Sequence, residues 1–153
     1  MITPFERTVN YYETDRMGIV HHSNYIRFFE ESRNYYMSEY GLPYEVIEEA
    51  GILIPVLSVE AQYKKPFRFG ETMVITEWMT QFSQVKFQVK YEVRNKETKE
   101  LHVVGTSEHC FVDEQLKPVR LKKDYPNIYQ VFANIYDIDT KLWNQSHTLT
   151  QSE

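Results

Sequence analysis

The sequence lacks the features that are typical of disulfide-bonded, membrane-spanning and secreted proteins. It has a single cysteine, Cys110, so no disulfide can form within the chain. It has no run of about 18 apolar residues, the length needed for a transmembrane helix. The N-terminal segment MITPFERTVNYYETD also lacks the apolar stretch of a secretory signal. We therefore expect a cytoplasmic protein.

The sequence also lacks an excess of positive charge and the spacings typical of metal ligands. The net charge of −5 disfavours a nucleic-acid partner for the chain as a whole. There is no H-x-x-x-H or C-x-x-C spacing, and the adjacent His21 and His22 point in different directions, so we expect no metal site. His109 and Cys110 do not predict a cysteine nucleophile, because neighbours in a strand lie on opposite faces. Ser107 is not part of a G-x-S-x-G motif.

Aromatic residues, by contrast, are abundant. They make up 15% of the chain, and the chain has 12 tyrosines. Tyrosine suits half-buried surfaces and subunit interfaces, which favours an oligomer, although core packing accounts for the same composition. The length, with 42% hydrophobic and 25% charged residues, is typical of one globular domain with a substantial core.

The periodicity of apolar residues predicts one early strand, one long helix and then a group of strands. Residues 5–12 alternate as in a strand, and residues 24–40 repeat at helical spacing. A short second helix is predicted at 43–50, strands at 52–63, 72–82, 85–94 and 101–113, and a terminal helix at 122–136. This order indicates an α+β fold with an antiparallel sheet of about five strands. One helix cannot cover every face and edge of such a sheet, and dimerisation is a simple remedy.

The most informative stretch is YYETDRMGIVHHSNYIRFFEESRNYY, residues 11–36. It predicts a strand, a turn that contains Asp15, and a helix that starts between His22 and Asn24. A helix start presents free N–H groups that can stabilise an oxyanion, and a nearby carboxylate can act as base or nucleophile. Acyl transfer needs that pair. The spacing alone, however, favours the simpler interpretation of Asp15 as a turn residue that caps a local N–H.

The run YYETDRMGIVHHSNYIRFFE, residues 11–30, resembles the signature of the 4-hydroxybenzoyl-CoA thioesterase family. It is most similar to the branch of acyl-CoA thioesterases associated with the Tol–Pal system. The resemblance implies a hotdog fold, in which an antiparallel sheet wraps a long central helix. It extends to about residue 137, so we expect a hotdog thioesterase domain at 1–137 and a polar, flexible tail at 138–153. Active sites in this family lie at a dimer interface, and many members are tetramers.

The resemblance also assigns roles to individual residues. It makes Asp15, three residues before Gly18, the catalytic carboxylate, and it gives the carbonyl-polarising N–H to His22. Glu13 departs from the family pattern, where aspartate is common, and we interpret this as a conservative change in the turn. The candidate substrate-binding residues are Gly18, Tyr25, Lys64, Lys65, Arg68, Ser83, Gln84 and Lys86.

The last six of these candidates are assigned to CoA. Lys64, Lys65 and Arg68 suit phosphate oxygens, although an ordinary solvated surface explains such a basic cluster more simply. Ser83, Gln84 and Lys86 lie in a turn and strand start that the family places near bound CoA.

The predicted function is hydrolysis of an acyl-CoA thioester to a carboxylic acid and free CoA. Asp15 would either attack the carbonyl or activate a water, and the sequence leaves both open. This chemistry requires no metal or organic cofactor. The alternative is a non-catalytic module that binds acyl-CoA or an acyl-carrier protein, and a further possibility is a thioesterase that acts on acyl-carrier proteins. We expect a homodimer or homotetramer.

Overall fold

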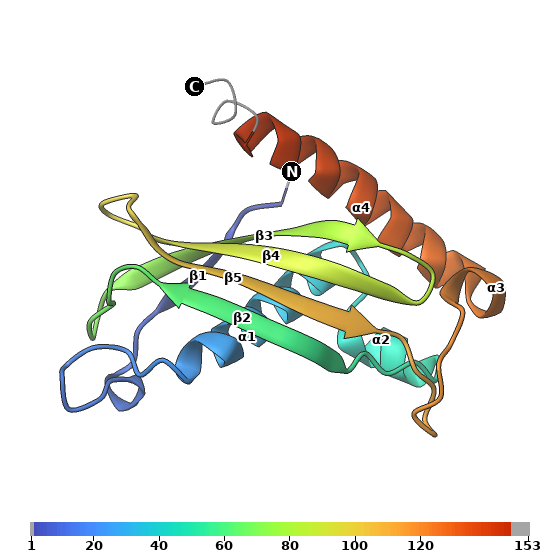
Figure 1. The fold of residues 1–153 in the computed structure, drawn as a ribbon, viewed down its shortest axis with the longest axis horizontal. Helices are drawn as coiled ribbons and strands as arrows, with labels where there is room; N and C mark the ends of the chain where they lie inside the picture. Colours follow the sequence, from blue (N-terminus) through green and yellow to red (C-terminus); the bar gives the residue numbers. More distant parts are fainter. Residues whose placement is uncertain (1, 148–153) are drawn as a thin grey trace.

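The computed structural model describes residues 2–147, which form one antiparallel sheet with helices packed against it (Figure 1). The strand order in the sheet is β1-β3-β4-β5-β2. The strands are β1 Phe5–Thr8, β2 Val56–Tyr63, β3 Thr72–Phe82, β4 Lys86–Asn95 and β5 Leu101–Cys110. The helices are α1 Asn24–Glu39, α2 Tyr44–Glu49, α3 Leu121–Asp124 and α4 Pro126–His147, with a 3₁₀ turn, η1, at Tyr11–Glu13. The predicted α+β class and antiparallel sheet are confirmed.

Helix α1 lies against the inner face of the sheet. Its buried residues recur every three or four positions, as in an amphipathic helix, and they include Tyr25, Phe28 and Phe29. The ring of Phe29 stacks on Tyr91 of β4, with 4.2 Å between centroids. Gly105 of β5 makes this close approach possible, because a Cβ there would lie only 2.5 Å from Cζ of Phe29. The position of α1 on the sheet is therefore fixed near its N-terminal half.

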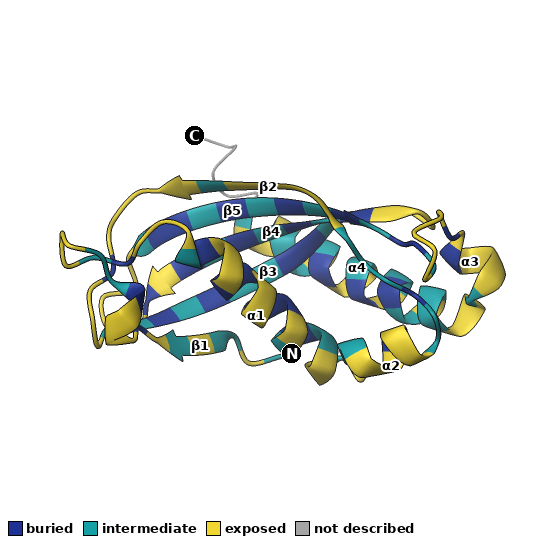
Figure 2. Cartoon of the chain, turned by 90° about the horizontal axis from the view of Figure 1, so that it is seen from below, coloured by how far each residue is buried: buried dark blue, intermediate teal, exposed yellow. Residues whose placement is uncertain are grey.

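Strand β4 shows the period-two pattern that the sequence predicts. Phe87, Val89, Tyr91 and Val93 are buried, and the residues between them are more exposed. The buried side chains share the face that packs on α1, where they form the centre of the hydrophobic core. In Figure 2 the dark blue segments of β3, β4 and β5 follow this inner layer.

The C-terminal helix is longer than the sequence predicts. Helix α4 continues to His147, so residues 138–147 are helical and do not form the expected polar tail. The predicted tail residues 148–153 lie outside the described part of the chain. The helix continues because two of its later residues have partners on β3. Asp139 accepts a hydrogen bond from the N–H of Met79 at 2.8 Å, and Trp143 packs edge-on against Trp78.

Several predicted strands are shorter in the structure. The first ends at Thr8, because β1 pairs only with residues 72–75 of β3 and the chain then turns into η1. Strand β2 begins at Val56, directly after Pro55. Strand β5 ends at Cys110, although Val112 still forms isolated bridges. Among residues 2–147, no helix combines the length and apolar character needed to cross a membrane.

Candidate active site

The loop that carries Asp15 is closed by hydrogen bonds of its own backbone. The Asp15 N–H donates to the carbonyl of Ile19, and the Gly18 N–H donates to the carbonyl of Asp15, both at 2.9 Å. Gly18 has φ of +77°, a conformation that other residues rarely adopt. The Oδ1 atom of Asp15 accepts the N–H of Met17 at 2.8 Å, which is the turn role that its spacing allows. Within residues 2–147, Oδ2 has no hydrogen-bond partner.

Asp15 opens onto a cleft of about 290 Å³. The cleft is formed by the Asp15 loop, the start of α1 and the segment that follows β2. Its lining residues are Asp15, Met17, Ile19, Val20, His22, Tyr25, Tyr63, Lys64, Lys65 and Pro66. The structure therefore brings together five residues that the sequence singles out, from positions up to 50 apart along the chain.

His22 lies where the loop enters α1. Its carbonyl accepts the hydroxyl of Tyr63 at 3.4 Å and the N–H of Tyr25 at 3.3 Å. Its own N–H donates to no acceptor in the described part of the chain, whereas the N–H of the preceding His21 donates to the carbonyl of Glu13. A free N–H at a helix start can stabilise a developing oxyanion.

Tyr25 forms part of the apolar wall of the cleft. It is 3% exposed, and its ring packs against Phe28 and Tyr63. Burial raises the pKa of Tyr25 to about 12, so its hydroxyl stays neutral at physiological pH. Tyr25 is therefore suited to contact an acyl group and unsuited to act as a base.

Basic side chains gather at one side of the cleft. Lys64 and Lys65 line it, and the backbone N–H of each donates to the carbonyl of His102. Nζ of Lys65 forms an exposed ion pair with Glu100 at 2.8 Å. A Cβ added at Gly18 would lie 3.6 Å from Nη1 of Arg68, so the Arg68 guanidinium lies beside the Asp15 loop. The predicted basic cluster thus adjoins the predicted carboxylate.

Ser83, Gln84 and Lys86 are not part of this cleft. They lie at the turn between β3 and β4, at the end of the sheet opposite the Asp15 loop (Figure 1). Ser83 and Lys86 line a separate hollow of about 150 Å³, and the carbonyl of Gln84 accepts the N–H of Leu121 at 2.9 Å. A single chain therefore does not place these three residues near Asp15.

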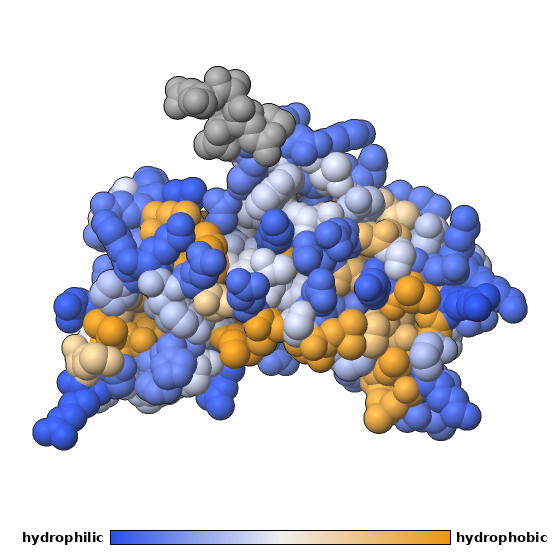
Figure 3. Space-filling model, in the orientation of Figure 1, coloured by the Kyte–Doolittle hydropathy of each residue, from blue (hydrophilic) through white to orange (hydrophobic). Residues whose placement is uncertain are grey.

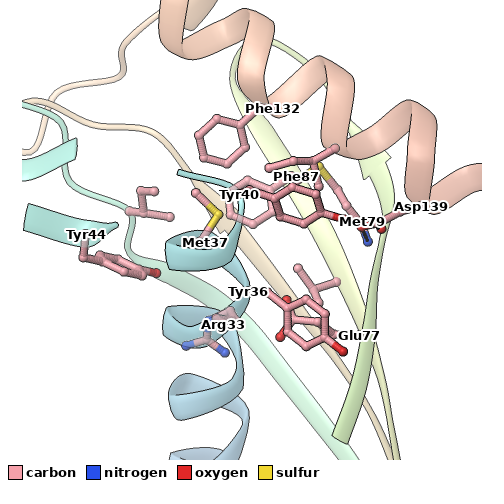
Figure 4. Close-up of a pocket in the computed structure, with 13 residues that line it drawn as sticks. Arg33, Tyr36, Met37, Tyr40, Tyr44, Glu77, Met79, Phe87, Phe132 and Asp139 are labelled. Carbon is pink, nitrogen blue, oxygen red and sulfur yellow. Dashed lines mark hydrogen bonds between the residues drawn. The ribbon is translucent and has the colours of Figure 1, made fainter. Parts of the chain in front are cut away.

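A second group of titratable side chains surrounds an inner pocket between α1, α4 and the sheet (Figure 4). Burial raises the pKa of Glu77 to about 8 and that of Asp139 to about 6. Nη1 of Arg33 donates to the hydroxyl of Tyr91 at 3.0 Å, while Nε of Arg33 is buried without a partner in the described chain. The pocket measures about 30 Å³, enough for one or two waters and too small for an acyl group.

Some residues of the cleft are not among the predicted site residues. Met17, Ile19 and Pro66 resemble ordinary loop residues, and only the folded structure shows that they line the cleft. Tyr63 directly precedes Lys64, which is the one local hint of its position. No group of three or more His, Cys, Asp or Glu residues within 2–147 is arranged to hold a metal ion.

Comparisons with known proteins place these features in a family. The family model described as the thioesterase-like superfamily matches residues 9–132. YneP of Bacillus subtilis, which its name assigns provisionally to the acyl-CoA thioesterases, is 36% identical over 83% of this chain and 92% of its own length. A 1,4-dihydroxy-2-naphthoyl-CoA hydrolase of Thermosynechococcus vestitus is 22% identical over 69% of this chain and 73% of its own. The crystal structure of a DHNA-CoA thioesterase from Staphylococcus aureus superposes with a TM-score of 0.84 at 29% identity, and covers 91% of this chain and 93% of that one.

Proposed function

Because the chain belongs to the thioesterase-like superfamily and has its hotdog fold, we propose that it hydrolyses acyl-CoA thioesters with Asp15 as the catalytic carboxylate. The observation that carries the proposal is the composition of one cleft. It contains a carboxylate with an unpartnered Oδ2, lies at a helix start with a free N–H, and is bordered by lysines. The relatives named above also act, by their names, on CoA thioesters.

In the proposed reaction the thioester carbonyl accepts the N–H of His22, where negative charge develops in the transition state. Asp15 Oδ2 then attacks the carbonyl carbon or takes a proton from an attacking water. Direct attack breaks the C–S bond, expels the CoA thiolate and leaves the acyl group on Asp15 as a mixed anhydride, which a water then hydrolyses to the carboxylic acid. In the other route the activated water adds to the carbonyl carbon, the C–S bond breaks, and the proton taken up by Asp15 passes to the CoA sulfur. Oδ1 keeps its bond to the Met17 N–H, which holds the carboxylate in place. Tyr25 and Tyr63 provide aromatic surface for the acyl group.

The CoA moiety is assigned to the basic side of the cleft. Lys64, Lys65 and Arg68 offer positive charge for its phosphates next to the carboxylate. Within one chain, the turn that contains Ser83, Gln84 and Lys86 lies at the opposite end of the sheet from this cleft (Figure 1). We therefore assign these three residues to the CoA bound by a neighbouring copy.

The β2 edge of the sheet supports assembly into a homodimer or homotetramer. Strand β2 pairs with β5 on one side only. Its side chains remain exposed, including Val56 at 50%, Leu57 at 54% and Val59 at 37%. Figure 2 shows the strand in yellow for most of its length, and Figure 3 shows hydrophobic surface along this edge. A long apolar edge strand invites pairing with another copy.

The deciding experiment follows release of the CoA thiol with a thiol-reactive dye over a panel of aliphatic and aromatic acyl-CoAs. Turnover of any of them that is lost in Asp15→Asn supports the proposal. Tight binding of acyl-CoA with no turnover would instead support the alternative, a non-catalytic module that binds acyl-CoA or an acyl-carrier protein. An acyl-carrier-protein thioester in the same panel tests the carrier.

Finer assignments go with this proposal. They are a place in the Tol–Pal-associated branch and location in the cytoplasm. The division into a catalytic domain at 1–137 and a C-terminal segment at 138–153 is likewise a proposal, although the helical residues up to His147 make part of that segment an extension of α4.

A further inference from the structure

We propose that Glu13 is a positioning residue, which uses a partly buried ion pair with Arg7 to set the distance between the Asp15 carboxylate and the His22 N–H. The proposal rests on the function proposed above. Glu13 lies two residues before Asp15 and does not line the cleft. Its side chain is 4% exposed, although glutamate is almost never fully buried unless it is paired.

The carboxylate of Glu13 has three hydrogen-bond donors around it. Arg7 approaches with both terminal nitrogens, Nη1 to Oε1 at 2.6 Å and Nη2 to Oε2 at 2.5 Å. Oε1 also accepts the N–H of Asn10 at 2.8 Å. Such a bidentate ion pair fixes the orientation of the carboxylate as well as its distance from the guanidinium, and lysine cannot reproduce it. The carboxylate is therefore committed to a structural contact.

Arg7 connects this contact to α1. Its Nε donates to Oε2 of Glu31 at 2.7 Å, and its guanidinium lies 4.2 Å above the ring of Phe28. Both Glu31 and Phe28 belong to α1, whereas Arg7 belongs to β1. The side chain of Arg7 thus connects the strand, the segment before Asp15 and the helix whose start carries His22.

The backbone of Glu13 also connects the segment before Asp15 to the start of α1. Its carbonyl accepts the N–H of His21 and the Nδ2 group of Asn24, both at 2.9 Å. These donors flank His22, so the position of its free N–H depends on the Glu13 carbonyl. Because Asp15 follows Glu13 by two residues, a shift of Glu13 changes the separation of the two proposed catalytic groups. A displacement of about 1 Å between such groups can cost on the order of 100-fold in rate.

The test compares Glu13→Gln and Arg7→Lys with the wild type. Each variant weakens the ion pair between Arg7 and Glu13. Glu13→Gln removes the negative charge, and Arg7→Lys removes the bidentate donor. We expect kcat for acyl-CoA to fall by about 10-fold or more in each, with KM changed less than about 2-fold, because the basic side of the cleft is untouched. The double variant should lose little more than either single one, because both remove one interaction. Glu6→Gln is the control, since Glu6 adjoins Arg7 and forms only an exposed ion pair with Lys96.

Hydrogen–deuterium exchange supplies a readout that does not depend on turnover. Both variants should speed exchange across residues 13–24, and Glu6→Gln should not. Wild-type kcat and wild-type exchange in the folded variants would overturn the proposal. So would loss of kcat in Glu13→Gln with full activity in Arg7→Lys, because Glu13 would then act in the chemistry itself. A wild type that hydrolyses no acyl-CoA would remove the proposed function, and the exchange data would still decide whether the ion pair positions the loop.

Discussion

Asp15 and Met17 are joined by a hydrogen bond of 2.8 Å from the backbone N–H of Met17 to Oδ1 of the carboxylate. A similar arrangement occurs at Asp113, whose Oδ1 accepts the backbone N–H groups of Gln115 and Lys117, both at 2.9 Å. The bonds of Asp113 stabilise a turn away from the cleft, whereas Asp15 also faces the cleft. The chain therefore provides a matched control for the proposed catalytic role of Asp15.

We predict that Asp15→Asn lowers kcat by at least about 100-fold, or roughly 2.7 kcal/mol of barrier. The amide oxygen can still accept the Met17 N–H, so the loop is expected to keep its shape. An amide can neither attack the carbonyl nor take a proton from water. Steady-state kinetics with the thiol-reactive dye measure the effect, and isothermal titration should show that acyl-CoA binding changes little. Asp113→Asn should retain wild-type turnover, and equal losses in both variants would point to folding as the cause.

The combined change of Lys64, Lys65 and Arg68 to Ala should raise KM for CoA esters by about 10-fold or more and change kcat less. Contacts to a remote phosphate act alike on the ground state and the transition state. The effect should shrink as salt concentration rises, because these side chains are exposed. Replacing Arg94, Lys96 and Lys141, which form exposed ion pairs outside the cleft, is the charge-matched control. An unchanged KM would place the phosphates elsewhere.

The parts of the fold that depend on local pattern could be predicted from the sequence. Helix α1 and strands β3 and β4 lie within about two residues of their predicted bounds, because each buries one face with a clear period. The proximity of Asp15 and His22 could also be predicted, because both belong to one short segment. The Lys64–Arg68 cluster reaches the same cleft only through the pairing of β2 with β5.

Other features depend on contacts between distant positions. Helix α4 continues past residue 137 because Asp139 bonds to Met79, 60 residues earlier in the chain. A polar sequence without that partner is typical of a frayed end. Glu13 is similar, since a glutamate in a turn normally faces solvent, and its burial follows from Arg7 on β1. Sequence periodicity contains no information on such partners.

Disrupting the β2 edge of the sheet should dissociate the protein. Leu57→Lys together with Val59→Lys places charge on β2, which discourages pairing of edge strands. Both side chains are exposed in the single chain, so the monomer should remain folded. Analytical ultracentrifugation should show a dimer or tetramer for the wild type and a monomer for the variant. If residues from a neighbouring copy complete the site, the monomer should also lose most of its turnover. A wild type that is monomeric at micromolar concentration would contradict the assembly proposed here.

The inner pocket predicts how stability depends on pH. Burial raises the pKa of Glu77 in the folded protein to about 8, from the 4.5 of an ordinary glutamate. The folded state therefore holds a proton on Glu77 that the unfolded state releases above about pH 4.5. This contribution to stability is fully present below that pH and is lost as the pH rises through about 8. Burial also raises the pKa of Asp139, to about 6. It therefore adds a second loss of stability with rising pH, which is complete at a lower pH than that of Glu77.

Glu77→Gln should remove most of the alkaline part of this dependence. The amide stays neutral at every pH, and its Oε1 can still accept the hydroxyl of Ser32, which now donates to Glu77 at 2.7 Å. Urea unfolding at pH 6 and pH 9 should show the wild type losing more free energy of unfolding than the variant, by at least about 1.4 kcal/mol, the equivalent of one pKa unit. Glu114→Gln, at an exposed position, is the control and should follow the wild type. Parallel pH curves for Glu77→Gln and the wild type would mean that Glu77 is ionised in the folded protein, with Arg33 as its counter-charge.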